Sequence, residues 1–333
     1  MINYREIWKS INEESAGYPD RGLIARKIPS SGAFSVFLAT DFRRKIRLLY
    51  VKLERDVLVK TNDLPRFRGF EISCVISSIG SFKNSEFLKL TQSIPETEGV
   101  FELVISDLCD HITRIKDRLH LNPLLIKVLA EWKLFFERSE DKMLTLAEQK
   151  GLFGELTFLK NYLLKIYPPD QALIFWTGGN RTNHDFQIDE KAVEIKATSG
   201  KMPWKFTVSS EKQLDNTGLK HLYLVLFIIN VHDNRTSDNL SAFVNEVFDM
   251  IRNDLSALSQ FEIKLAKYGY YMSHSEKYTT GFSLIQVNAF EVRNDFPRLI
   301  NTKIPLGIGD IKYTVMVSAC TEFEIKTDII NLI

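Results

Sequence analysis

The feature that most constrains the fold is an apolar segment in the second half of the chain, Leu222-Tyr-Leu-Val-Leu-Phe-Ile-Ile-Asn-Val231. A helix that spans a membrane needs about 20 apolar residues, and this segment has only ten residues. A short apolar segment is instead typical of a strand whose two faces are both buried. The sequence therefore predicts a covered sheet in which residues 222–231 form a central strand.

The segments before this strand show first helical and then β periodicity. From residue 119 to residue 136, apolar residues recur at helical spacing. Thr145 and Glu148 form a capping box, which predicts the start of a second helix. Residues 185–188 and 193–197 then alternate polar and apolar side chains around a turn-like segment, and this pattern predicts a β-hairpin.

Strand and helix patterns continue on both sides of the apolar segment. Residues 206–209 predict a third strand, and 210–213 form a second capping box that predicts the start of a helix. Residues 239–256 have the spacing of an amphipathic helix, and strand patterns follow at 282–292 and 313–319. This order of elements indicates an α/β fold.

The first part of the chain has a different pattern and predicts a β-rich domain. Its strand-like segments lie at 34–40, 46–53, 70–76 and 100–105, separated by turn-forming residues. The chain has 333 residues, which at about 150 residues per domain suggests two domains. We therefore expect an N-terminal domain at 1–118 and a second domain at 119–333.

Charge and cysteine content exclude several classes of protein. The chain has 43 Lys and Arg against 42 Asp and Glu, a net charge of +1, which excludes a polycation held to nucleic acid by bulk charge but allows a local basic groove. Cys74, Cys109 and Cys320 are far apart in sequence, so neither a zinc knuckle nor a disulfide framework is indicated. We expect a cytoplasmic protein that does not associate with a membrane.

Three acidic residues and a lysine fall at positions that suggest metal-dependent chemistry. Glu194 and Lys196 lie two apart on a predicted strand and share a face, Asp185 starts the preceding strand, and Glu155 lies on the helix before it. Magnesium prefers hard oxygen ligands, which Asp185, Glu194 and the backbone carbonyl of Ile195 would supply. Lys196 would hold or help deprotonate the attacking water and screen the phosphate, and Glu155 would orient a water or complete a second metal site. This arrangement suits phosphodiester hydrolysis.

The spacing Asp185, eight residues, Glu194-Ile-Lys196 resembles the motif of the PD-(D/E)XK nucleases, with Glu155 matching their helical acidic residue. Ser210 to Gln213 is similar to a fourth motif, whose glutamine lies beside the active site. The longer pattern from Gly151 to Leu214 resembles a PD-(D/E)XK family found in bacterial restriction and phage-defence loci. One difference is His184, which stands where the superfamily motif has proline.

The resemblance implies a restriction-endonuclease-like core, that is, a mixed four-stranded sheet flanked by helices. The motifs span residues 145–232, so the core would carry the β-rich N-terminal domain before it and an α+β C-terminal extension after it. In this interpretation the N-terminal domain, residues 1–118, would bind DNA or a partner. The implied activity is that of a DNA endonuclease of restriction or defence type that uses Mg²⁺, with Mn²⁺ as a substitute. The alternative is a catalytically inactive, nuclease-derived subunit that binds DNA or assembles a defence complex.

The implied partner is DNA, and several cations near the motifs are candidate contacts. Arg181, Lys201, Lys205 and Lys212 are these candidates, and Trp204 lies among them in the sequence. A solvated loop is the alternative interpretation of the segment around Trp204. The chain has no P-loop motif and no methyl-donor loop, so a motor or methyltransferase would act in trans. A homodimer is expected if both DNA strands are cut.

Three other groups of residues have two open interpretations each. His184 either contacts substrate or is structural. The basic segment 43–47 either contacts nucleic acid or forms an exposed hairpin turn. The tyrosines of the segment 268–278 either stack on bases or belong to the core. A globular scaffold with a chance motif is the third interpretation of the whole chain, and it would be revealed if the four charged site residues failed to meet in space.

Overall fold

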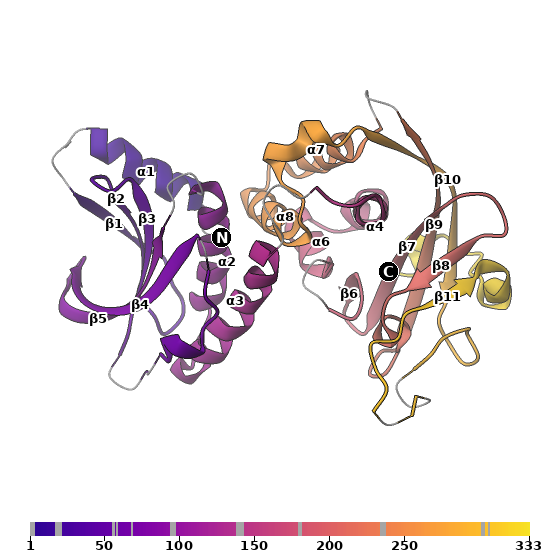
Figure 1. Cartoon of the computed structure of the whole chain (residues 1–333), viewed down its shortest axis with the longest axis horizontal. Helices are drawn as coiled ribbons and strands as arrows, with labels where there is room; N and C mark the ends of the chain where they lie inside the picture. Colours follow the sequence, from indigo (N-terminus) through magenta and orange to yellow (C-terminus); the bar gives the residue numbers. More distant parts are fainter. Residues whose placement is uncertain are drawn as a thin grey trace. The chain divides into compact units, whose positions relative to one another are not determined.

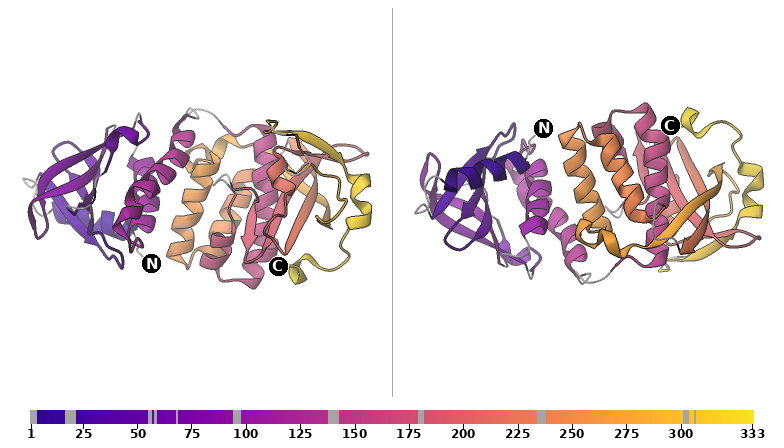
Figure 2. Two further views of the ribbon diagram at one scale, coloured as in Figure 1. Left: turned by 90° about the horizontal axis from the view of Figure 1, so that it is seen from below. Right: turned by 90° about the horizontal axis from the view of Figure 1, so that it is seen from above.

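The chain forms two compact units, residues 1–142 and 143–333, in the computed structural model (Figures 1 and 2). The structure describes residues 4–16, 22–54, 57, 59–67, 69–93, 98–137, 143–178, 182–233, 238–300, 304–305 and 307–333. Among these residues, no helix is both long and apolar enough to cross a membrane. The mixed α/β class predicted from the sequence is confirmed.

The first unit is built on an antiparallel five-stranded sheet with the strand order β1-β2-β3-β5-β4. Helix α1 packs against β1 and β2, α2 packs against β3, and α3 packs against α2. The elements are α1 (Tyr4–Ala16), β1 (Leu23–Ile28), β2 (Val36–Asp41), β3 (Ile46–Lys52), β4 (Phe70–Ile79), β5 (Phe82–Gln92), α2 (Glu98–Ile112) and α3 (Leu121–Glu137). The strands predicted at 34–40, 46–53 and 70–76 are confirmed as β2, β3 and β4, whereas β1 and β5 were not predicted.

The strand predicted at 100–105 is wrong, because this segment lies inside α2. Its apolar residues continue at helical spacing beyond the predicted strand, and Val104, Ile105, Leu108 and Ile112 are all fully buried. These positions recur three and four residues apart, so together they form one apolar face of a helix. The six residues taken alone resemble a strand because they are rich in Val, Ile and Phe.

The predicted domain boundary at 118/119 also differs from the structure, which places α3 in the first unit. The apolar face of α3 includes Leu125, Leu129 and Trp132, and all three side chains are fully buried. The Trp132 Nε1 donates a hydrogen bond to Asp107 Oδ2 of α2 at 2.8 Å. A domain boundary between α2 and α3 would therefore expose this apolar face. The structure places the boundary after Lys142 and not at 118/119.

The basic segment 43–47 divides between surface and core. Residues 43–45 form the exposed turn between β2 and β3, as one of the two interpretations held. Arg47 is buried, and its Nη1 donates hydrogen bonds to Asn12 Oδ1 at 2.9 Å and Thr40 Oγ1 at 2.8 Å. Its Nη2 lies 2.9 Å from Glu102 Oε1. Arg47 therefore joins helices α1 and α2 to the sheet.

The second unit is built on a mixed four-stranded sheet with the order β10-β9-β7-β6. Strands β7 and β9 are parallel, and the other two pairs are antiparallel. The strands are β6 (Phe186–Ile188), β7 (Lys191–Ser199), β9 (His221–Asp233) and β10 (Thr280–Glu291), while β8 (Lys205–Val208) and β11 (Tyr313–Met316) form a separate two-stranded sheet. The helices are α4 (Leu146–Phe158), α5 (Leu164–Ile166), α6 (Pro169–Phe175), α7 (Leu240–Ile251) and α8 (Leu255–Tyr268).

The side chains of β9 alternate between two hydrophobic clusters. Val225, Phe227 and Ile229 pack in a cluster with residues of α4, α6, α7 and α8. Leu224 and Leu226 pack in the other cluster with residues of β8 and β11. Figure 1 shows the helices on one side of the sheet and the β8–β11 pair on the other. This confirms the prediction that residues 222–231 form a strand buried on both faces.

The local predictions around the motifs have mixed outcomes. The hairpin at 185–197 is confirmed as β6 and β7, and the capping box that starts α4 is present, with Thr145 N donating to Glu148 Oε2 at 2.9 Å. The helix predicted after Ser210 is only a 3-10 turn, Glu211–Leu214. The reason is that the Gln213 side chain accepts from Ser209 N at 2.8 Å and does not close a capping box.

The part after residue 232 is not a mere extension of the core. Strand β10 is the fourth strand of the sheet and packs against α7, while α8 packs against α6 and α7 within the same main hydrophobic cluster. The sequence analysis did not predict α8, which starts after Asp254 and ends at Gly269, where φ is +99°. The core therefore needs residues well beyond the motifs.

The corrected boundary predicts how two truncated chains behave. Residues 143–333 alone should be monodisperse in size-exclusion chromatography and should unfold cooperatively in circular dichroism, because this unit has its own core. Residues 119–333 should aggregate, because α3 would expose the face that α2 covers. Equal solubility of the two fragments would contradict the boundary after Lys142.

Candidate active site

Glu155 lies on α4, which packs closely on the sheet. A Cβ at Gly154 would lie 3.1 Å from Ile195 Cγ2 and 3.4 Å from Ala197 Cβ, so a small residue at this position lets the helix approach β7. The carboxylate of Glu155 is buried, and each oxygen accepts one hydrogen bond. Trp176 Nε1 donates to Oε2 at 2.7 Å, and Tyr268 OH donates to Oε1 at 2.6 Å.

Asp185 lies directly before β6, where backbone hydrogen bonds hold the chain in place. Its carbonyl oxygen accepts hydrogen bonds from Thr177 N at 2.8 Å and Gly178 N at 2.9 Å. Its side-chain Oδ2 accepts from Ile195 N on β7 at 2.7 Å. The Asp185 carboxylate is therefore fixed beside the peptide group that joins Glu194 to Ile195.

Glu194 and Lys196 lie on β7, as the two-residue spacing predicted. Lys196 Nζ lies 2.6 Å from Glu194 Oε1 and donates a second hydrogen bond to Gln213 Oε1 at 3.0 Å. The same Gln213 oxygen accepts from Ser209 N. The 3-10 turn after β8 thus supplies a group that orients the lysine from the side of the sheet opposite α4.

The electrostatics of the site follow from placing several carboxylates in a buried space. Burial, reinforced by the nearby carboxylate of Asp185, raises the pKa of Glu194 to about 8. Burial also raises the pKa of Asp185, and burial together with the charge of Asp185 raises the pKa of Glu155 well above its ordinary value. Burial lowers the pKa of Lys196, but the carboxylates of Glu194 and Asp185 outweigh it, so this pKa is raised. Lys196 therefore carries a positive charge here.

The site offers oxygen atoms to a hard cation. Glu194 Oε2 is fully buried and has no hydrogen-bond partner among the described residues, which is a costly state unless a ligand binds it. The described residues contain no group of three or more His, Cys, Asp and Glu side chains that would hold a metal ion. Magnesium does not need such a group, because it commonly binds one or two carboxylates and keeps several waters. The residues present therefore fit Mg²⁺ and do not fit zinc.

The structure brings together all five predicted catalytic residues, namely Glu155, Asp185, Glu194, Lys196 and Gln213. The four charged residues therefore converge, which is the opposite of the separation that would have revealed a chance motif. Lys201 and Lys205 line a pocket next to Lys196. Lys212 is exposed and does not line this pocket, and Arg181 lies outside the described residues.

His184 contributes to the site mainly through its backbone. Its carbonyl oxygen accepts hydrogen bonds from Thr177 Oγ1 and Thr182 Oγ1, both at 2.8 Å. Burial lowers the pKa of the imidazole, and its Nε2 has no partner among the described residues. The carbonyl contacts favour the structural interpretation of this residue.

The sequence analysis missed the partners of Glu155. Tyr268 lies on the unpredicted helix α8, and no sequence spacing connects it to a residue 113 positions away. Trp176 lies within the segment from Gly151 to Leu214 that resembles the family, but its hydrogen bond to Glu155 was not predicted. Gly178 is a third case, because a Cβ there would overlap Glu155 Oε2 and lie 2.7 Å from Trp176 Nε1. Tyr270 and Tyr278 are core residues, which stack with ring centroids 5.1 Å apart.

The raised pKa of Glu194 predicts a pH-dependent stability effect. Between the ordinary value of 4.5 and about 8, the folded chain holds a proton that the unfolded chain releases, so the free energy of unfolding falls as pH rises through this interval. Glu194→Gln has no such proton to lose. In EDTA at pH 9 its melting temperature should exceed that of the wild type by at least about 2 °C, and at pH 4 the two should coincide.

The matched control for this prediction is Glu211→Gln. Backbone N–H groups, including that of Ile311 at 3.0 Å, hold the pKa of Glu211 below its ordinary value. This carboxylate therefore stabilises the fold above its unfolded pKa, and its replacement should lower the melting temperature at pH 9. Calorimetric scans across pH measure both effects, and the same sign for both variants would contradict the assignment.

The contact at Gly178 predicts a sensitive position. Gly178→Ala should displace the Glu155 carboxylate or the loop that follows Trp176, since Glu155 is held by two donors and cannot move freely. We expect a loss of at least about 1 kcal/mol in the free energy of unfolding, measured by urea denaturation. Gly309→Ala is the control, because no atom lies within 4 Å of a Cβ at that position.

Comparison with known proteins agrees with this geometry. Residues 4–318 match the sequence model of a family described as "Putative PD-(D/E)XK family member, (DUF4420)". No curated protein matches the chain significantly, and neither does any solved structure. The matched region spans nearly the whole chain and includes all five site residues, and the resemblance inferred from the sequence is confirmed. The chain is therefore a member of this PD-(D/E)XK family.

Proposed function

We propose that this chain is a DNA endonuclease that hydrolyses phosphodiester bonds with the help of Mg²⁺, with Mn²⁺ as a substitute. The observation that carries this proposal is the meeting of Asp185, Glu194 and Lys196, with Glu194 Oε2 buried and unpartnered. Membership of a PD-(D/E)XK family and the mixed sheet beneath these residues support it.

Each residue has a role that follows from its contacts. Asp185, Glu194 and the carbonyl of Ile195 would hold the metal ion, which when bound supplies Lewis acidity and lowers the pKa of a water. Lys196 is charged and donates hydrogen bonds, so it holds the attacking water or a phosphate oxygen in position. Gln213 restricts the lysine to one direction. Glu155, fixed by its two donors, orients a further water from the α4 side.

The substrate and setting belong to the same proposal. A lysine-lined pocket beside Lys196 suits the phosphates of a nucleic acid, and the resemblance to proteins of restriction and phage-defence loci favours foreign DNA in the cytoplasm. A single site cuts one strand at a time, so cleavage of both strands would involve two copies of the chain. Motor or methyltransferase functions would come from other subunits of a defence system.

The test is a cleavage assay with the full-length chain on plasmid and linear DNA in Mg²⁺ or Mn²⁺. We expect Asp185→Asn, Glu194→Gln and Lys196→Ala each to lower the rate by about 100-fold or more, since each removes a group that binds charge in the transition state. Glu190→Gln is the matched control. Glu190 lies on the exposed β6–β7 turn, where it forms a salt bridge with Lys220, so this variant should leave the cleavage rate unchanged.

Isothermal titration calorimetry with Mn²⁺ separates cleavage from metal binding. Asp185→Asn and Glu194→Gln should abolish the binding that the wild type shows, whereas Lys196→Ala should retain it. A wild type that neither binds Mn²⁺ at these carboxylates nor cuts DNA, even with the neighbouring subunits of its locus present, would overturn the proposal in favour of the non-cleaving subunit.

A further inference from the structure

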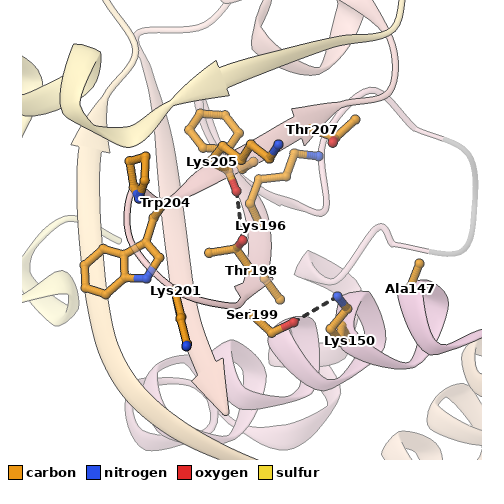
Figure 3. A pocket seen from close by; sticks show the side chains of 12 residues that line it. Ala147, Lys150, Lys196, Thr198, Ser199, Lys201, Trp204, Lys205 and Thr207 are labelled. Carbon is orange, nitrogen blue, oxygen red and sulfur yellow. Dashed lines mark hydrogen bonds between the residues drawn. The ribbon is translucent and has the colours of Figure 1, made fainter. Parts of the chain in front are cut away.

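A pocket of about 350 Å³ lies next to the candidate active site. Figure 3 shows its walls, which come from the end of β7, the loop after it, β8 and the first two turns of α4. Pockets for small ligands have volumes of about 300–1,000 Å³, so this one is at the small end of the range. It has room for a single nucleotide and not for a base pair with both of its backbones.

The lining of the pocket is cationic. No acidic residue lines it, and four lysines do: Lys150, Lys196, Lys201 and Lys205. Within the part of the chain that the structure describes, Lys201 and Lys205 form no salt bridge, so their charges are available to a ligand. A chain with a net charge of only +1 thus concentrates positive charge in one small concave site. Such a site favours an anion.

Trp204 gives the pocket an aromatic wall. The side chain is half-buried, and its Nε1 donates a hydrogen bond to Gly200 O at 3.3 Å, which fixes the indole relative to the loop. Bases of single-stranded DNA stack on aromatic side chains of this kind, and lysines beside them bind the backbone. An aromatic wall next to lysines therefore suits a base and its phosphate together better than a free phosphate ion.

Two hydrogen bonds join the walls of the pocket (Figure 3). Thr198 Oγ1 donates to Lys205 O at 2.8 Å and links β7 to β8, while Lys150 Nζ donates to Ser199 Oγ at 3.2 Å and links α4 to β7. The pocket is therefore preformed, and a ligand that fits it does not have to organise these three elements.

Lys196 belongs both to this pocket and to the active site, because its Nζ contacts Glu194. We propose that the pocket binds one unpaired nucleotide of a DNA strand, directly beside the phosphate that is cleaved. The base packs against Trp204, and the phosphate oxygens contact Lys201 and Lys205. The inference rests on the proposed function, and it makes single-stranded or locally unpaired DNA the form that enters the site.

The test measures binding of the full-length chain in EDTA, where no cleavage occurs. A fluorescently labelled single-stranded DNA of 12 nucleotides (chosen to span about one site) is compared with the same sequence as a duplex. We expect the single strand to bind at least about 10-fold more tightly. It should also quench the tryptophan emission, which in this chain comes from one half-buried tryptophan, Trp204, and three buried ones, Trp8, Trp132 and Trp176.

Two kinds of variant separate stacking from charge. Trp204→Leu should weaken single-strand binding by about 10-fold without changing its salt dependence, and Trp204→Phe should restore most of the affinity. A plot of log association constant against log salt concentration falls with a negative slope, to which each phosphate contact on a single strand contributes about −0.7. The double variant Lys201→Ala/Lys205→Ala should therefore make this slope less steep by about 1.4. Lys165→Ala/Lys326→Ala removes two exposed lysines that do not line the pocket and should change neither quantity.

The outcomes distinguish this inference from the proposed function. Tighter binding of duplex than of single strand, or wild-type affinity and salt slope in the Trp204 and lysine variants, would overturn the pocket assignment while metal-dependent cleavage stands. Trp204-dependent single-strand binding by a chain that cuts no DNA would uphold the pocket and overturn the nuclease proposal.

Discussion

The second unit depends on one electrostatic constraint, the burial of the Asp185 and Glu194 carboxylates beside each other and beside Lys196. Two like charges in a buried site repel, and this repulsion adds to the cost of removing each from water. The pKa of Glu194 is raised for the same reason. Lys196 compensates part of it through its contact with Glu194. A bound cation of the kind we propose would compensate more of this cost.

The rest of the fold keeps these charges in place. Strand β9 is held from both faces, and β7 pairs with it in parallel along nine residue pairs, so the backbone that carries Glu194 and Lys196 has little freedom. Helix α4 reaches this strand through Gly154, and the turn that carries Gln213 approaches from the other side. Apolar packing thus fixes the polar groups in geometries that they would not adopt alone.

Predictions from the sequence succeeded where the deciding interactions are local. The capping box at Thr145, the hairpin of β6 and β7 and the double burial of residues 222–231 depend on spacing within a few residues. The strand predicted at 100–105 failed because this segment, taken alone, hides the longer helical face of α2 to which it belongs. The other failures occurred where distant contacts decide. One example is α3, which is joined to α2 of the first unit by the hydrogen bond from Trp132 to Asp107. A second is the hydrogen bond from Tyr268 to Glu155, which joins residues 113 positions apart.

The corrected boundary after Lys142 has a consequence for how such chains diversify. All five site residues lie in residues 143–333, and the first unit has a separate core held by residues such as Arg47 and Trp132. The hydrophobic clusters around the carboxylates are made of residues of the second unit. The core of the first unit can therefore change without changing any residue of the core that carries the site.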